Sequence, residues 1–151
     1  MNQRQAFTVI NQLVSPFLRE AGFSIEGSKG ATWFKRINDD LYWFIAFDLF
    51  AGRKVFDIKV FPGSPSFGAD QWKDFPNQVG VPSGGGAGLN AKLGVGHGAS
   101  KFSYANEVAL KAAVLSAVLP ALESFAIPYL SSFKTVKDIL LILEPLNGLH
   151  C

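Results

Sequence analysis

The chain has only one cysteine and two histidines among its 151 residues. The cysteine is Cys151, the last residue of the sequence, so no internal disulfide can form. A fraying chain end is also a poor place for a catalytic thiol. The histidines, His97 and His150, lie far apart in the sequence and give no metal-ligand spacing. We therefore expect no disulfide framework, no metal site and no cofactor.

The sequence also lacks a strong net charge and a long apolar run. Its formal charge of +2 is too small to indicate nucleic-acid binding or attraction to an anionic membrane. The longest apolar run, residues 112–122, is about half the length that crosses a bilayer. The N-terminal segment has neither the apolar core nor the cleavage pattern of a signal peptide. We expect a cytoplasmic protein that binds neither nucleic acid nor membrane.

The residues that are present are those of an ordinary globular protein. Hydrophobic residues make up 48% of the chain and charged residues 17%, and the 14 phenylalanines favour thick aromatic packing. The length is that of one domain, which we place at residues 1–151.

Both ends of the chain have helical periodicity. Apolar residues at spacings of three and four predict a helix over residues 3–21, which Gly22 stops and Pro16 kinks or divides. The same period returns after residue 103, where Asn106 is a suitable cap. Pro120 is expected to bend this second helix.

A new helical segment is expected to start at Pro128. A last helix is predicted to open at Thr135, with Asp138 three positions further on in the place of a capping-box carboxylate.

The stretch between these helical ends begins with strands. Aromatic and β-branched residues dominate residues 31–37, 41–50 and 54–61, and short turn sequences separate the three runs. A further short strand is expected at residues 23–26. We predict an α+β fold in which an antiparallel meander of three or four strands carries the helices of both chain ends on one face.

A long glycine-rich segment, residues 62–101, holds ten of the fifteen glycines. Residues 86–91 match the dinucleotide-binding fingerprint, but no strand precedes them and no helix pattern starts there. Lys101 follows a serine, so the P-loop order fails as well. A helical turn at residues 68–75 and a strand at 91–95 remain open. We interpret the segment as a flexible flap over the sheet, with His97 as a candidate binding residue.

The turn between the second and third runs predicts the strand faces. Pairing Phe50 with Val55 makes one face uniformly apolar, and this face must lie against the helices. The same register places Asp48 directly opposite Asp57 on the other face. That face is expected to combine aromatic with charged side chains: Trp33, Lys35, Tyr42, Phe44, Asp48, Asp57, Lys59 and Phe61.

Three interpretations of the Asp48–Asp57 pair remain open, since like charges at paired positions destabilise a hairpin. The carboxylates can belong to an ion-paired cluster with Lys59, and Lys35 or Arg53 can contribute as well. They can bind a hard cation, although two oxygen ligands make a weak site. Alternatively, one carboxyl serves as an acid or base.

Two stretches lie at the two ends of the chain, "PFLREAGFSIEGSKGATWFKRINDDLYWFIAFDLF" and "VLPALESFAIPYLSSFKTVKDILLIL". They resemble a bacterial family, the domain of unknown function 4304. The family's second strand usually contains glutamine, where residues 45–49 here read "IAFDL". The resemblance implies a small bacterial α+β domain, and it assigns no catalytic residue.

These observations favour a non-enzymatic protein-binding module with a protein partner and no catalytic residue. Small bacterial α+β domains of this kind include immunity-type proteins that neutralise toxins, which is an analogy of fold alone. The alternative is a small-ligand-binding protein or an enzyme with a pocket between the sheet and the glycine-rich segment. The candidate binding residues are Trp33, Tyr42, Asp48, Asp57, Lys59 and His97.

Overall fold

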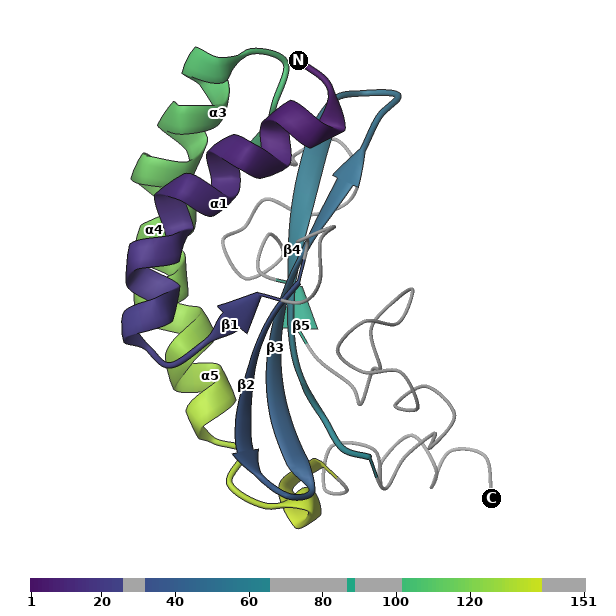
Figure 1. Ribbon diagram of the computed structural model, residues 1–151, viewed down its shortest axis with the longest axis vertical. Helices are drawn as coiled ribbons and strands as arrows, with labels where there is room; N and C mark the ends of the chain where they lie inside the picture. Colours follow the sequence, from purple (N-terminus) through teal and green to yellow (C-terminus); the bar gives the residue numbers. More distant parts are fainter. Residues whose placement is uncertain (26–31, 66–86, 89–101, 140–151) are drawn as a thin grey trace.

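The protein is an α+β fold in which helices from both chain ends cover one side of an antiparallel sheet, as predicted (Figure 1). The computed structural model describes residues 1–25, 32–65, 87–88 and 102–139, and the statements below concern these residues. Four strands follow one another as a meander: β1 (Ser24–Ile25), β2 (Thr32–Asn38), β3 (Leu41–Phe50) and β4 (Val55–Gly63).

Two short strands complete the sheet at the outer edge of β4. Strand β5 (Ala87–Gly88) pairs with Lys59 and Val60, and β6 (Phe102–Ser103) pairs with Val55 and Phe56. The glycine-rich segment therefore contributes to the sheet through β5 as well as through the end of β4. His97, the helical turn expected at 68–75 and the strand expected at 91–95 lie outside the described residues.

Helix α1 (Gln3–Glu20) begins and ends with sequence-encoded caps. The Asn2 side chain accepts a hydrogen bond from the Gln5 backbone, and the Gln5 side chain accepts one from Asn2, which forms a capping box. Pro16 lies inside the helix without dividing it. Gly22 follows the end with φ +93°, a left-handed conformation that glycine adopts most easily.

The second long helix runs from Glu107 to Ser131 as α3 (Glu107–Ala113), α4 (Leu119–Ala121) and α5 (Ile127–Ser131), and we call it the α3–α5 helix. Asn106 caps its start, since its side chain accepts a hydrogen bond from the Ala109 backbone. π-Helical turns at Val114–Val118 and Leu122–Ala126 join the α-helical parts. Prolines follow both turns, and since a proline nitrogen donates no hydrogen bond, a wider turn lets the helix continue.

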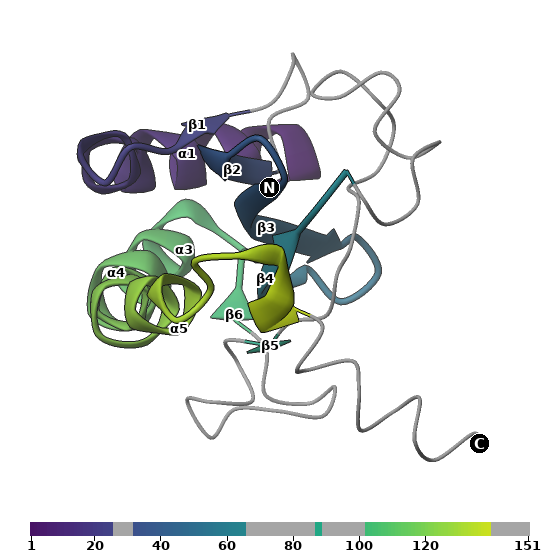
Figure 2. The same cartoon turned by 90° about the horizontal axis from the view of Figure 1, so that it is seen from below.

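Both helices lie on the same side of the sheet, next to one another (Figure 2). Their buried residues, such as Ile10, Val14 and Val118, form one core with the apolar face of the strands. Tyr104 joins this core, and its hydroxyl donates a hydrogen bond to the Phe50 carbonyl at 2.9 Å.

The last helix is described over residues 136–139. At its start the Asp138 carboxylate accepts hydrogen bonds from the backbone of Lys134 and Thr135. The bond from Thr135 is the one that the predicted capping box requires.

The α3–α5 helix is long and apolar enough to cross a membrane by length and composition alone. This is weak evidence, because a core helix of a soluble protein meets the same criterion. Seven of its side chains are buried in this fold: Leu110, Val114, Val118, Ala121, Leu122, Ala126 and Leu130.

The predicted register between β3 and β4 is confirmed along its whole length. Phe50 pairs with Val55, Asp48 with Asp57 and Ile45 with Val60. The side of the sheet that carries Ile45 and Phe47 packs against the helices.

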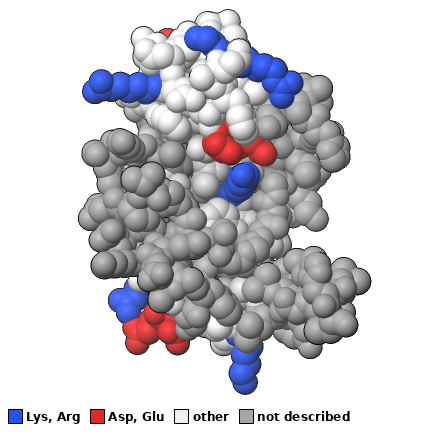
Figure 3. Space-filling model, turned by 90° about the vertical axis from the view of Figure 1, so that its right-hand side faces the viewer, with Lys and Arg blue, Asp and Glu red and all other residues white. Residues whose placement is uncertain are grey.

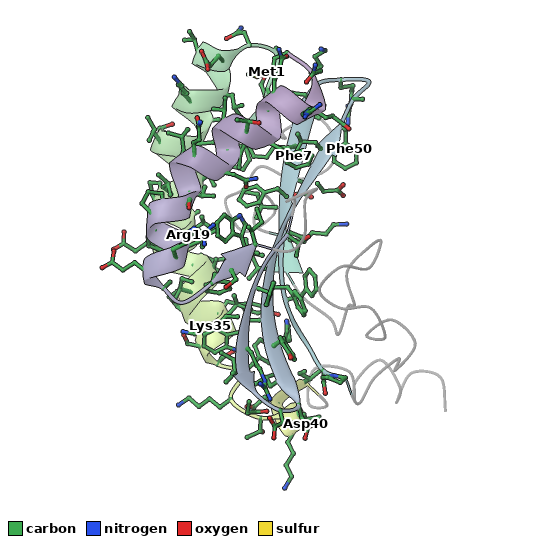
Figure 4. All side chains as sticks on the ribbon, viewed as in Figure 1. Met1, Phe7, Arg19, Lys35, Asp40 and Phe50 are labelled. Carbon is green, nitrogen blue, oxygen red and sulfur yellow. The ribbon has the colours of Figure 1, made fainter. Side chains whose placement is uncertain are left out.

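The predicted face of Trp33 and Lys35 is wrong. Trp33 pairs with Ile45 and is only 1% exposed in the core, and its indole donates a hydrogen bond to Asn11 of α1. Lys35 also points to the helix side and donates to the carbonyl of Ala21 at 2.9 Å (Figure 4). A register shift between Arg36 and Asn38 causes the reversal, since a shift of one residue turns every side chain of a strand to the other face.

Candidate functional site

The side of the sheet turned away from the helices is the candidate site, and we call it the open face. Cross-strand pairs of β3 and β4 follow one another along it from the turn between these strands. Phe50 and Val55 come first, then Asp48 and Asp57, then Ala46 and Lys59, then Phe44 and Phe61, and finally Tyr42 and Gly63. The open face thus has a charged half near the turn and an aromatic half beyond it.

The aromatic half is largely buried. Phe44 is 0% exposed and Phe61 7% exposed, and their rings stack with centroids 5.2 Å apart. Tyr42 stacks on the other side of Phe44 at 6.2 Å. Three stacked rings of this kind provide packing area, and only Tyr42 among them has a polar group.

The charged half consists of Asp48, Asp57 and Lys59. The Lys59 ammonium group lies 3.5 Å from a carboxylate oxygen of Asp48, and both side chains are about half exposed, at 58% and 45%. Asp57 accepts a hydrogen bond from the Ile58 backbone at 2.7 Å. Figure 3 shows acidic and basic side chains together on this side of the molecule. The predicted ion pair between Lys59 and the carboxylates is confirmed for Asp48.

Of the two chemical alternatives, neither gains support from this geometry. Within the described residues, no group of three His, Cys, Asp or Glu side chains could hold a metal ion. A half-exposed carboxylate next to an ammonium group is typical of a surface ion pair.

Two hollows in the described part of the chain lie elsewhere. One, of about 540 Å³, lies between α1 and the start of the α3–α5 helix and is lined by Gln5, Thr8 and Glu107, among others. The other, of about 410 Å³, lies at the start of α1 and is lined by Arg4, Lys54 and Tyr104, among others. Neither contains Asp48, Asp57 or Lys59.

The structure thus brings together four of the six candidate binding residues. Tyr42, Asp48, Asp57 and Lys59 share the open face, whereas Trp33 belongs to the core. Sequence analysis missed Arg4, which lies beside the β3–β4 turn because α1 crosses that end of the sheet. No local pattern signals this contact, since the partners are about fifty residues apart in the sequence.

Comparison of the chain with protein-family models, with curated proteins and with solved structures found no match. The resemblance at the two chain ends therefore stays a prediction.

Proposed function

We propose that this protein is a non-enzymatic protein-binding module, and that the charged half of the open face receives a basic side chain of its partner. The proposal depends on one observation, the direct pairing of Asp48 with Asp57 on a half-exposed sheet face. Like charges at directly opposite positions destabilise a hairpin.

The charges that the described residues place at this position do not balance. Two carboxylates face one ammonium group, and that group lies next to Asp48. Within the described residues Asp57 has no ion-pair partner, and it accepts a hydrogen bond from the backbone of the neighbouring Ile58. A lysine or arginine from another protein would offset the repulsion, and such complementary charge favours recognition and fast association.

Phe50 gives the same surface an apolar contact. It lies one pair nearer the turn on the same face, and 37% of its area is exposed. Aromatic rings next to charged groups are common at protein interfaces. The pocket of the alternative hypothesis, by contrast, lacks support among the hollows that the described residues line.

The test is affinity capture with two matched variants of the full chain. One variant carries Asp48→Asn and Asp57→Asn, which removes both charges and nearly preserves shape. The control carries Glu20→Gln and Glu123→Gln, which removes two exposed charges on the helices. We expect a protein captured by the wild type and the control to be lost from the open-face variant.

Equal capture by all three proteins would contradict the proposal. Loss of a small molecule rather than a protein would favour the ligand-binding alternative. A toxin-neutralising role is the narrower form of the proposal. It predicts that co-expression with a captured toxin restores growth for the wild type and the control, and fails to do so for the open-face variant.

A further inference from the structure

A second charged surface lies at the end of the sheet where α1 starts, and it carries the opposite sign. Three exposed basic side chains gather there, Arg4 from the first turn of α1 and Arg53 and Lys54 from the β3–β4 turn. We call these three residues the basic end. Met1 and Phe50 mark this end of the molecule in Figure 4, and Asp40 marks the opposite one.

Hydrogen bonds fix the two segments of the basic end to one another. The Gln3 side chain donates to the Leu49 carbonyl at 3.0 Å, and the Lys54 ammonium group donates to the Met1 carbonyl at 2.7 Å. The Lys54 carbonyl in turn accepts a hydrogen bond from the Tyr104 backbone at 2.9 Å. The cations are thus held on a preformed surface, which lowers the entropy that binding costs.

No acidic side chain offsets this charge in the part of the chain that the structure describes. The ion pairs found there join Arg36 to Asp39, Lys59 to Asp48 and Lys111 to Glu107, and they involve none of the three residues of the basic end. The first turn of α1 also contains no acidic residue, although a helix start favours negative charge.

A further observation shows that positive charges lie close together here. The charge of Lys54 lowers the pKa of the Met1 amino group, which is the effect of a nearby positive charge. An anionic partner would relieve the repulsion between the cations.

The surface is hollowed between the two segments. Arg4 and Lys54 line the same hollow of about 410 Å³, together with Met1 and Tyr104. This volume is enough for one or two carboxylate side chains of a partner and too small for a folded domain.

From this charge and shape, we propose that the basic end binds a carboxylate-rich segment of another polypeptide. Complementary charge identifies the partner. A nucleic acid fits less well, because stable binding to a phosphate backbone commonly uses about 6–10 contacts. The basic end adjoins the open face at the β3–β4 turn but shares none of its charged residues, so this proposal does not depend on the preceding one.

The test is binding of a fluorescein-labelled polyglutamate peptide to the full chain, followed by fluorescence anisotropy at several salt concentrations. The test variant carries Arg4→Gln and Arg53→Gln, whose side chains are exposed and form no hydrogen bond with the described part of the chain. The matched control carries Lys134→Gln and Lys137→Gln, which removes two exposed charges beside the last helix. We expect the test variant to bind about tenfold more weakly at low salt and the control to bind like the wild type.

Three results would overturn the proposal: no binding to the wild type at low salt, equal weakening in both variants, or tighter binding of single-stranded DNA of the same charge. Thermal unfolding of both variants checks that they fold. If the test variant does not fold, Arg53→Gln alone replaces it and is expected to weaken binding about threefold. None of these results bears on Asp48 or Asp57, so failure here leaves the open-face proposal in place.

Discussion

The pairing of Asp48 with Asp57 leads to a quantitative prediction for a double-mutant cycle. Directly opposite side chains have Cβ atoms about 5 Å apart. Two unit charges about 5.5 Å apart in water repel with about 0.7 kcal/mol, and salt at 0.15 M reduces this to about 0.4 kcal/mol. The cycle of Asp48→Asn, Asp57→Asn and the double variant should therefore show a repulsive coupling of about 0.4 kcal/mol at physiological salt, rising to about 0.6 kcal/mol at 0.01 M.

The single variants should differ, because the Lys59 ammonium group lies beside Asp48. Asp57→Asn removes the repulsion and leaves that ion pair intact, so it should stabilise the protein. Asp48→Asn removes the repulsion and the ion pair together, so its free energy of unfolding should change little. Urea unfolding at two salt concentrations measures both effects.

Two results would contradict this reasoning. Zero coupling at low salt would mean that the carboxylates are farther apart than their backbone pairing indicates. An attractive coupling would mean that they share a proton or a bound cation, which would revive the alternative that the open face is a ligand site. Lys59→Met provides the control, since loss of its charge should destabilise the wild type and have less effect in the Asp48→Asn background.

Three further predictions concern the caps and the helix side of the sheet. Gly22→Ala should lower the free energy of unfolding by about 1–2 kcal/mol in urea, because φ is +93° and the added Cβ would lie 3.0 Å from the Lys35 side chain. Lys35→Met should cost about 1 kcal/mol by the same measurement, because the Ala21 carbonyl at the end of α1 would lose its charged donor. The pKa of Asp138 is lowered by backbone hydrogen bonds from Lys134 and Thr135. Its stabilising effect is therefore complete above the usual carboxyl pKa and is lost as the pH falls through the lowered value. The protection factors of the amides at residues 136–139, which are corrected for the pH dependence of intrinsic exchange, should fall in acid for the wild type and change less with pH for Asp138→Asn.

The β3–β4 hairpin shows how much of the candidate site the sequence predicts. A short polar turn between two apolar runs fixes which residues pair, and the two-residue period then fixes the faces. Asp48 and Asp57 could therefore be placed opposite one another from the sequence, and the structure confirms it. The distance from Lys59 to each carboxylate depends on side-chain rotamers, which no sequence pattern specifies.

Strand β2 shows why the rest could not be predicted. Its faces depend on one irregular position between Arg36 and Asn38, and an extra residue there leaves no mark in the hydrophobic pattern. Trp33 and Lys35 interact favourably with either side of a sheet, because each combines an apolar body with a polar tip. Their hydrogen bonds on the helix side go to Asn11 of α1 and to the carbonyl of Ala21 at the end of α1. Both partners are distant in sequence from β2, so the strand's own pattern does not show which face it turns to them.

The reversed face of β2 has a consequence for the charge of the open face. On the predicted register Lys35 was a further candidate to neutralise Asp48 and Asp57, but it lies on the helix side and bonds to the end of α1. Arg53, the other candidate, forms no ion pair with either carboxylate. Lys59 is thus the one cation paired with them in the described part of the chain. The β2 irregularity therefore has two effects: Lys35 binds the end of α1, and among the described residues Asp48 and Asp57 are left with one paired cation, Lys59. A basic side chain from a partner would supply a second cation.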